Sequence, residues 1–212
     1  MSEPEERGRL GFDMSDMIDT TIVLVGPHGA GKTTLGTALA RRLGVPFHDE
    51  IGRRLAADAS LRPAGTNASH CQPSYDEQVF AEELARDTGW RGKGARVVET
   101  WHPGNLAYAQ ARSEAQVRRF LPAILRAVQW HRVLVVPLAI TGETLRARQH
   151  EPAPADFFLR VGSAAHAWSW TLGLEVLPVL RTDFGTPEEL VTLLVRRLRG
   201  ERPWRRAREG RS

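Results

Sequence analysis

A hydrophobic segment that runs into a glycine-rich loop constrains the fold of this chain more than any other feature. Residues 21–34 read T-I-V-L-V-G-P-H-G-A-G-K-T-T, so an apolar run leads directly into the pattern Gly-x-x-x-x-Gly-Lys-Thr at residues 26–33. An unbroken apolar run of this kind is typical of a strand that is buried on both faces of a parallel sheet. The glycines allow the positive φ angles and close backbone approach with which a loop surrounds a phosphate group. The segment therefore predicts a strand, a phosphate-binding loop and a helix, in that order.

This loop predicts that the chain binds ATP together with Mg²⁺. Lys32 is expected to reach the β- and γ-phosphates, and the Thr33 hydroxyl is expected to ligate Mg²⁺. The positive end of the following helix, whose leucines at 35, 39 and 43 keep helical spacing, would also face the phosphates. The predicted nucleotide-binding residues are Gly26, His28, Gly29, Ala30, Gly31, Lys32, Thr33 and Thr34.

The length of 212 residues fits one α/β domain, which we expect to span about residues 18–198. Residues 1–17 lack apolar periodicity and are predicted to form a mobile leader, and residues 199–212 a basic, disordered tail. The single cysteine, Cys71, permits no intrachain disulfide, and the chain has neither a signal-peptide pattern nor an apolar run of about 18 residues. These features favour a cytoplasmic protein without a membrane partner.

The positive charge is concentrated at the end of the chain. Residues 196–212 hold eight Arg and two Glu, whereas the formal net charge of the whole chain is only +4. A nucleic-acid partner would use these arginines to bind phosphates and Trp204 to stack on a base. A solubilising end is the simpler explanation of such a charge run, so a nucleic-acid partner is not expected.

Strands and helices alternate along the chain, which predicts the three-layer α/β fold of P-loop NTPases, a parallel sheet of about five strands with helices on both faces. Besides the first strand, strands are expected at 45–48, 95–99, 132–138 and 175–180. Helices are expected at 49–55, 76–89, 105–111 and 114–128, after Thr141 as an N-cap, and from Pro187 onward. Residues 58–75 predict a long loop, either a substrate-side flap or a surface excursion.

Ligands of a parallel sheet bind beyond the carboxyl ends of its strands, so polar residues at those positions are candidates for a site. Asp49 and Glu50 follow the second expected strand. A carboxylate there can accept the proton of an attacking hydroxyl group, although two acids at a helix start also complement the helix dipole. Arg53 lies one turn after Glu50 and can hold the substrate.

Glu99 ends an otherwise apolar strand, where an unpaired carboxylate would be costly to bury. Binding of Mg²⁺ through water, binding of substrate hydroxyls, or a salt bridge to a neighbouring arginine would each explain it. Trp101 and His102 follow closely and can stack on or hydrogen-bond a substrate ring, unless Trp101 only covers the end of the sheet.

Two stretches resemble the P-loop kinases of small molecules, in particular the nicotinamide riboside kinase-like branch of the nucleoside kinases. Residues 26–55 carry the phosphate loop, its helix, and an acid followed three positions later by arginine; residues 97–109 read V-V-E-T-W-H-P-G-N-L-A-Y-A. The resemblance implies transfer of the γ-phosphate of ATP to a hydroxyl of a small molecule, such as a nucleoside, a riboside or a similar metabolite, with Glu50 as the base. Relatives usually have arginine where this chain has Thr100, so the identity of the acceptor stays open.

Arg146 and Arg148 resemble the lid arginines of these kinases, which close over the transferring phosphate. Their spacing places them on different faces of a helix, so one rather than both is expected to act, with residues 149–156 as the mobile lid. Asp183, after the last expected strand, is implied to flank the adenine, as this loop does in related kinases.

Two other classes of protein stay open. One is a nucleic-acid-end kinase, which would use the basic tail. The other is a non-kinase P-loop ATPase or switch, although the chain holds no Asn-Lys-x-Asp motif for guanine recognition. A homodimer is also left open, because relatives often pair through helices.

Overall fold

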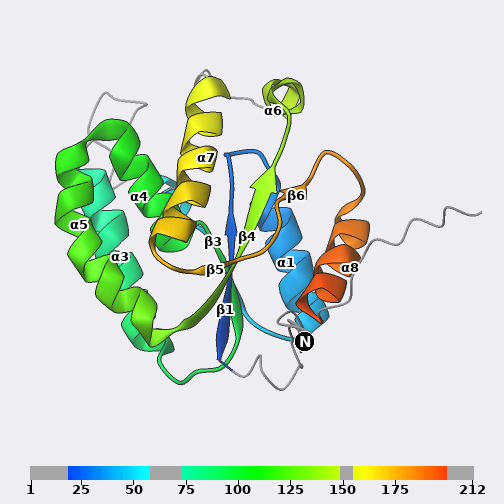
Figure 1. Cartoon of the computed structure of the whole chain (residues 1–212), viewed down its shortest axis with the longest axis horizontal. Helices are drawn as coiled ribbons and strands as arrows, with labels where there is room; N and C mark the ends of the chain where they lie inside the picture. Colours follow the sequence, from blue (N-terminus) through cyan, green and yellow to red (C-terminus); the bar gives the residue numbers. More distant parts are fainter. Residues whose placement is uncertain (1–18, 58–72, 149–154, 200–212) are drawn as a thin grey trace, which may run out of the picture.

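The computed structural model describes residues 19–57, 73–148 and 155–199, which form one parallel sheet between two layers of helices (Figure 1). The strands are β1 (Thr20–Val25), β2 (Phe47–His48), β3 (Arg96–Glu99), β4 (Arg132–Ala139), β5 (Glu175–Val176) and β6 (Leu180–Arg181). Their order is β2-β3-β1-β4-β5, and β6 also pairs with β4; every pair is parallel. The predicted α/β fold is confirmed.

Two groups of helices cover the two faces of the sheet (Figure 1). The helices are α1 (Lys32–Leu43), α2 (Ile51–Ala57), α3 (Pro73–Trp90), α4 (Trp101–Arg112), α5 (Glu114–Ala127), α6 (Gly142–Arg148), α7 (Ala155–Thr171) and α8 (Pro187–Leu198), with a 3₁₀ turn at Val128–Trp130. Side chains of β1 alternate between the faces, because Ile22 and Leu24 pack toward α1 and α8, whereas Val23 and Val25 pack toward α3, α4, α5 and α7. Both faces of the central strand are therefore buried, as its unbroken apolar run predicts.

The helices α1 and α8 begin in different ways. Gly31, the N-cap of α1, has a left-handed backbone with a φ of 84° and makes no side-chain cap. Thr186, the N-cap of α8, forms a capping box, because its hydroxyl accepts a hydrogen bond from the Glu189 N–H (3.3 Å) and its own N–H donates to Glu189 Oε2 (2.8 Å). In the described part of the chain, the first N–H groups of α1 therefore have no cap from the N-cap residue.

Two strands are shorter than predicted, and a proline adjoins each break. The second strand is limited to β2, because Pro46 has no N–H to donate to a ladder. The expected strand 175–180 is split into β5 and β6 around Pro178. Leu177 still donates its N–H to the Val135 carbonyl (2.9 Å), so the chain stays beside β4 across the break.

Two helices are longer than predicted. Helix α3 begins at Pro73, so residues 73–75 are helical rather than part of the expected loop. Helix α4 begins at Trp101 instead of residue 105, directly after the end of β3. Several predictions lie wholly or mostly outside the described residues: the leader 1–17, the loop 58–72, the lid at 149–154, and the tail from residue 200 onward.

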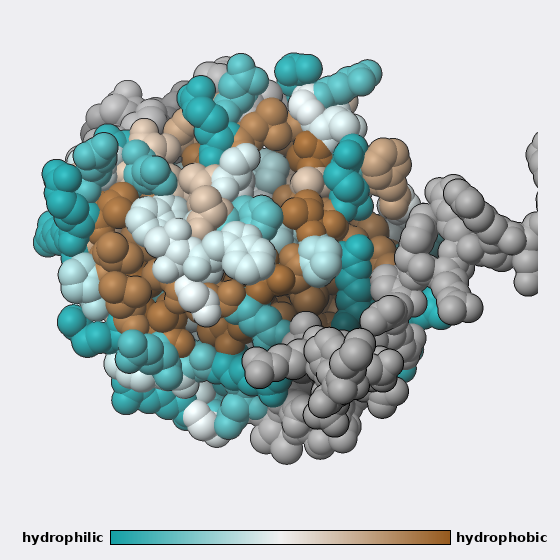
Figure 2. All heavy atoms as spheres, in the orientation of Figure 1, coloured by the Kyte–Doolittle hydropathy of each residue, from teal (hydrophilic) through white to brown (hydrophobic). Residues whose placement is uncertain are grey.

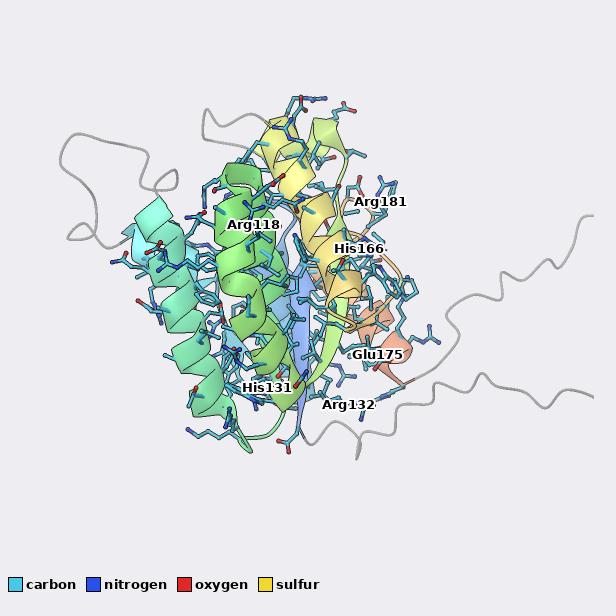
Figure 3. All side chains as sticks on the ribbon, turned by 60° about the vertical axis from the view of Figure 1, so that its left-hand side comes forward. Arg118, His131, Arg132, His166, Glu175 and Arg181 are labelled. Atoms are coloured by element: carbon cyan, nitrogen blue, oxygen red, sulfur yellow. The ribbon has the colours of Figure 1, made fainter. Side chains whose placement is uncertain are left out.

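The carboxyl ends of the strands point toward the edge of the sheet where α6 lies. Figure 3 shows this direction, with Arg132 at the start of β4 near the bottom and Arg181 in β6 near the top.

On the face seen in Figure 2, apolar surface shows between polar side chains. The large hydrophobic side chains that are exposed in the described part of the chain are Leu125, Trp130, Trp170, Val179 and Phe184. None of the described helices is both long and apolar enough to cross a lipid bilayer.

Candidate active site

The glycine-rich loop connects β1 to α1, and its glycines have the backbone that the sequence predicts. The φ angles are 152° at Gly26, 80° at Gly29 and 84° at Gly31. A Cβ atom at Gly26 would lie 2.6 Å from the Leu138 carbonyl oxygen, and one at Gly29 would lie 3.0 Å from a methyl carbon of Leu145. At these two positions a side chain would meet both backbone strain and a neighbour.

The side chains around the loop differ in what they can offer a ligand. Lys32 is buried and donates from Nζ to the carbonyl oxygens of Gly26 (3.1 Å) and Pro27 (3.0 Å). Ala30 is fully buried in the core, so only its backbone can take part. His28 is exposed, with its ring centroid 5.2 Å from that of Phe158 in α7. The lysine is therefore already held over the loop by the loop's own carbonyl groups.

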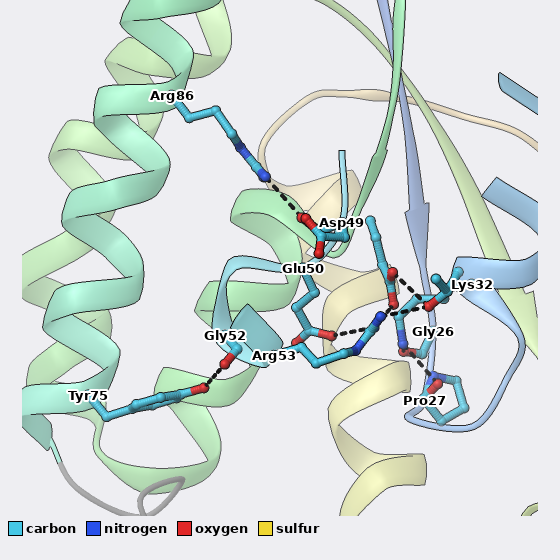
Figure 4. A network of polar contacts seen from close by, with 11 residues as sticks. Gly26, Pro27, Lys32, Asp49, Glu50, Gly52, Arg53, Tyr75 and Arg86 are labelled. Atoms are coloured by element: carbon cyan, nitrogen blue, oxygen red, sulfur yellow. Dashed lines mark hydrogen bonds and ion pairs between the residues drawn. The ribbon is translucent and has the colours of Figure 1, made fainter. Parts of the chain in front are cut away.

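Thr33, Glu99 and Arg53 form a hydrogen-bonded triangle at the end of the loop, and Figure 4 shows Arg53 between Glu50 and the phosphate loop. The Thr33 hydroxyl donates to Glu99 Oε2 (2.9 Å) and accepts from Arg53 Nη1 (2.9 Å). The second guanidinium nitrogen of Arg53, Nη2, donates to Glu99 Oε1 and lies 3.6 Å from Glu50 Oε2. Residues from α1, α2 and β3 are thus brought together, although more than sixty positions separate Thr33 from Glu99.

The triangle surrounds a carboxylate that is almost completely buried. Glu99 is 1% exposed. Of the three explanations that the sequence leaves open for this residue, the salt bridge to an arginine is present, and the arginine is Arg53. Burial alone would lower the pKa of Arg53, but the attraction of Glu99 and Glu50 outweighs burial and raises it. Arg53 is therefore a fixed positive charge between two carboxylates.

Glu50 and Asp49 face different parts of the structure (Figure 4). Glu50 approaches Arg53 and is largely buried, whereas the Asp49 side chain is exposed and its carbonyl oxygen accepts from Arg86 Nη1 (2.9 Å). Of the two acids that the sequence proposes as a base, Glu50 is the one beside the triangle.

Tyr75 is a residue of this region that sequence reasoning misses, because it falls in the expected loop. Its hydroxyl donates to the Gly52 carbonyl oxygen. A Cβ atom at Gly52 would lie 3.0 Å from the Tyr75 hydroxyl and 3.7 Å from Glu50 Oε1. Burial, and next the nearby Glu50 charge, raise the pKa of Tyr75 to about 12, so its hydroxyl stays protonated.

Helix α6 brings one of the two candidate lid arginines to the phosphate loop. Thr141 caps this helix as predicted, because its hydroxyl accepts from the Thr144 N–H (3.2 Å). Arg148 Nη1 donates to the Gly29 carbonyl oxygen (3.4 Å), whereas Arg146 is exposed and makes no described contact with the loop. Of the two arginines, Arg148 is thus the one that contacts the phosphate loop. That only one of them acts on the phosphate stays a prediction.

The prediction that Trp101 and His102 contact a substrate ring is wrong in this structure. Both side chains are fully buried. The Trp101 indole N–H donates to Asp87 Oδ1 (2.8 Å), and His102 Nε2 lies 2.5 Å from Asp87 Oδ2. The reason is that α4 begins at Trp101, so that these two residues form its first turn and face α3. The alternative, in which Trp101 packs at the end of the sheet, agrees with the structure.

Asp183 is held by a neighbouring arginine. Arg181 donates from Nε to Asp183 Oδ1 (3.0 Å) and from Nη2 to Oδ2 (2.8 Å), and these hydrogen bonds lower the pKa of Asp183 to about 2. Its expected place beside the adenine stays a prediction.

A groove of about 350 Å³ lies between α1 and α8, lined among others by Thr33, Thr34 and Pro187, so it adjoins the phosphate loop.

Two oxygen-bearing side chains at the end of the phosphate loop have the chemistry that Mg²⁺ requires. Mg²⁺ prefers oxygen ligands and is usually held by one or two protein groups together with substrate phosphates. The Thr33 hydroxyl and the Glu99 carboxylate supply two such oxygens 2.9 Å apart at the end of the phosphate loop. In the described part of the chain, no three His, Cys, Asp or Glu residues gather into a separate metal site. The residues present therefore fit a magnesium ion that arrives with a nucleotide.

The strand order and the loop together define the class of protein. A parallel sheet whose central strand β1 leads through a Gly-x-x-x-x-Gly-Lys-Thr loop into a helix is a P-loop nucleotide-binding fold. The chain belongs to the AAA domain family, whose profile matches residues 21–185.

Part of the sequence and the fold are also similar to those of individual proteins. A shikimate kinase from Ruegeria pomeroyi is 69% identical over 117 residues, which make up 53% of this chain and 56% of the relative. The fold is similar to that of a NadR protein in complex with NR (TM-score 0.62, 17% identity, 90% of this chain and 52% of that chain). It is also similar to deoxyadenosine kinase from M. mycoides (TM-score 0.59, 9% identity, 84% and 98%). The chain spans only about half the length of this curated relative and of the NadR chain.

Proposed function

We propose that this chain is an ATP- and Mg²⁺-dependent phosphotransferase that transfers the γ-phosphoryl group of ATP to a hydroxyl group of a small molecule. One observation carries the proposal: the phosphate-loop residue Thr33 shares a hydrogen-bonded cluster with Glu99 and Arg53, and Glu50 adjoins it. A site that only bound a triphosphate would not need a further carboxylate on the side away from the loop. The similarity to a shikimate kinase supports a kinase over other P-loop proteins.

The loop and α6 would hold the nucleotide. The uncapped N-terminus of α1 offers backbone N–H groups to the phosphates. Lys32 would exchange the two loop carbonyls that it now contacts for phosphate oxygens. Arg148 already reaches the loop from α6 and would neutralise charge on the transferring group.

Thr33 and Glu99 would hold Mg²⁺, which when bound neutralises negative charge on the phosphate oxygens. Arg53 now contacts both of these residues, so its guanidinium would have to give up the Thr33 hydroxyl when the metal is bound. Its contact with Glu50 would keep it on the acceptor side of the site, where it can bind an oxygen of the acceptor.

Glu50 would act as the base. The acceptor oxygen forms a bond to the γ-phosphorus while the bond from that phosphorus to the bridging oxygen breaks, and ADP leaves with the electron pair. The hydroxyl proton passes to the Glu50 carboxylate. Arg53 would hold the Glu50 carboxylate in place. Tyr75, whose pKa is raised by burial and by the nearby Glu50 charge, would line the acceptor side of the site.

A screen for the acceptor tests the proposal. The purified chain is incubated with ATP and Mg²⁺ and with shikimate, nucleosides, ribosides, nucleotides or other metabolite alcohols, and mass spectrometry detects an added phosphate. We expect one class of acceptor to be phosphorylated, and Lys32→Ala to abolish the transfer. Glu50→Gln should slow the chemical step by about 10²–10⁴-fold while leaving ATP binding in place.

Three results would contradict parts of this proposal. Hydrolysis of ATP at a catalytic rate with no acceptor consumed would favour an ATPase or a switch. Full transfer by Glu50→Gln would remove Glu50 as the base. Transfer to oligonucleotide ends would instead favour the nucleic-acid-end kinase. Salt-dependent oligonucleotide binding that survives deletion of residues 199–212 would exclude a role for the basic tail.

A further inference from the structure

Helix α3 places polar side chains beside the residues that follow β2 and β3. Glu83 is 1% exposed and Asp87 is fully buried, and they lie one helical turn apart. Between them, Arg86 bonds to Glu83 and donates to the Asp49 carbonyl oxygen just after β2. Burying two carboxylates is costly unless each is bonded, and both have partners: Glu83 is bonded to Arg86, and Asp87 to residues that follow β3.

Asp87 binds the first turn of α4 with both of its oxygens. Its Oδ1 accepts from the Trp101 indole N–H at 2.8 Å, and its Oδ2 lies 2.5 Å from His102 Nε2. All three residues are fully buried. Hydrogen bonds to a buried charge are stronger than those between neutral groups, so Asp87 fixes the place of these two side chains.

The backbone that carries these side chains is strained. In the described part of the chain, Thr100 and Trp101 are the two non-glycine residues with positive φ, 72° and 48°. The Thr100 hydroxyl and His102 Nδ1 are buried without a hydrogen-bond partner among the described residues. Such conformations are sparsely populated for residues with a Cβ atom and persist only where surrounding contacts hold them. Asp87 supplies those contacts directly after the strained turn.

The strained turn directly follows Glu99. The Thr100 N–H donates to the Leu24 carbonyl oxygen (2.9 Å), so the chain stays in the sheet up to this point and then reverses into α4. The turn is also crowded, because a Cβ atom at Gly104 would lie only 2.2 Å from Thr100 Cγ2. The turn that Asp87 holds therefore begins at the residue directly after Glu99.

We propose that Asp87 is a positioning residue for the metal site. By binding Trp101 and His102 it keeps the turn after β3 in its strained form, and this turn directs the Glu99 carboxylate to the Thr33 hydroxyl. The part of this inference that concerns Mg²⁺ rests on the proposed function, whereas the part that concerns the turn rests on the geometry alone.

Asp87→Asn and Trp101→Phe test the inference. Asparagine keeps the shape of the side chain but replaces charge-assisted hydrogen bonds by neutral ones, and phenylalanine removes the indole N–H. Glu83→Gln is the matched control, because it replaces a carboxyl group that is also buried on the same helix but is hydrogen-bonded to Arg86 and Asn105 instead of the turn. Calorimetry would measure the Mg²⁺ concentration at which ATP binding is half-maximally strengthened.

We expect both test variants to raise that Mg²⁺ concentration by about 10–100-fold, the usual effect of losing a group that orients a metal ligand. ATP binding without Mg²⁺ should change little, and Glu83→Gln should leave the Mg²⁺ requirement unchanged. An unchanged requirement in both test variants would overturn the proposal. An equal increase in Glu83→Gln would also overturn it, because the effect would then reflect a general loosening of α3.

A crystal structure of Asp87→Asn separates this inference from the proposed function. We expect Thr100 to leave its positive φ and the Glu99 carboxylate to move out of hydrogen-bond distance of Thr33. If both stay in place, Asp87 does not position Glu99, whatever the metal does. If both move while the wild-type chain shows no strengthening of ATP binding by Mg²⁺, the positioning role holds and the proposed metal site fails.

Discussion

Replacing Thr33 by valine removes one hydroxyl group from the centre of the candidate site and keeps the volume of the side chain nearly constant. Two hydrogen bonds are lost, one to Glu99 and one from Arg53, each 2.9 Å long. The Arg53 side chain is 41% exposed and can bind water instead, so the loss of its hydrogen bond contributes little to the change in stability. Glu99 is buried, and after the substitution only its Oε1 keeps a partner, Arg53, while Oε2 loses the Thr33 hydroxyl. We therefore expect the free energy of unfolding to fall by about 2 kcal/mol, within the range for hydrogen bonds to charged groups.

This change is large enough to measure. For a protein of this size, about 1 kcal/mol shifts Tm by roughly 2–4 °C, so Thr33→Val should lower Tm by roughly 4–8 °C in calorimetry without ligand. Calorimetric titration should further show that ATP binds with similar affinity without Mg²⁺, but that Mg²⁺ no longer strengthens the binding. Thr33→Ser keeps the hydroxyl group and is the control; it should retain the effect of Mg²⁺ and most of the stability.

Two outcomes would refute this reasoning. If Thr33→Val unfolds at the wild-type temperature, the hydroxyl does not stabilise the buried carboxylate. If Mg²⁺ strengthens ATP binding in Thr33→Val as it does in the wild type, the hydroxyl is not a ligand of the metal, and the site must hold Mg²⁺ by other groups.

Three further predictions concern other parts of the structure. Arg148→Met should slow phosphoryl transfer by roughly a hundredfold, whereas Arg146→Met, which removes a guanidinium without a described contact to the loop, should have a much smaller effect on kcat. Burial, followed by neighbouring arginines, lowers the pKa of His48 from 6.5 to about 4, so the unfolded chain binds more protons than the folded one between these values. Stability should therefore fall as the pH drops through this window, and urea unfolding of His48→Gln should show a shallower fall. Thr186→Ala removes the capping box of α8 and should cost about 1 kcal/mol in urea unfolding, without changing the affinity for ATP.

The phosphate loop was predictable because its geometry depends on residues that are close in the sequence. Gly26, Gly29 and Gly31 meet their backbone requirements within six positions, and the helix after them follows from local spacing. Glu99 was also identifiable, since a charged residue at the end of an apolar strand needs a partner. That Arg53 is a partner could not be derived from spacing alone, because it depends on how β2 and α2 lie beside β3.

The errors at Trp101 and His102 have a physical cause. A helix that begins directly after a strand requires a sharp turn, and here the turn uses positive φ at Thr100 and Trp101, residues whose types disfavour it. Local propensity therefore predicts the helix start at residue 105, four residues too late. With that start, Trp101 and His102 would lie in a loop that faces the ligand. The contact that overrides propensity comes from Asp87, which looks like an ordinary polar residue of a helix.

The uncapped start of α1 has a consequence for measurements in solution. In the described part of the chain, no side chain at the N-cap position accepts from the backbone N–H groups of the first turn of this helix, and a bound phosphate would supply an acceptor. Amide hydrogen exchange in this turn should thus slow when a nucleotide binds, residue by residue, and so report occupancy of the loop without any label. The first turn of α8, which Thr186 already caps, provides an internal reference whose exchange should not respond. One protein sample would then contain both the sensor and its control.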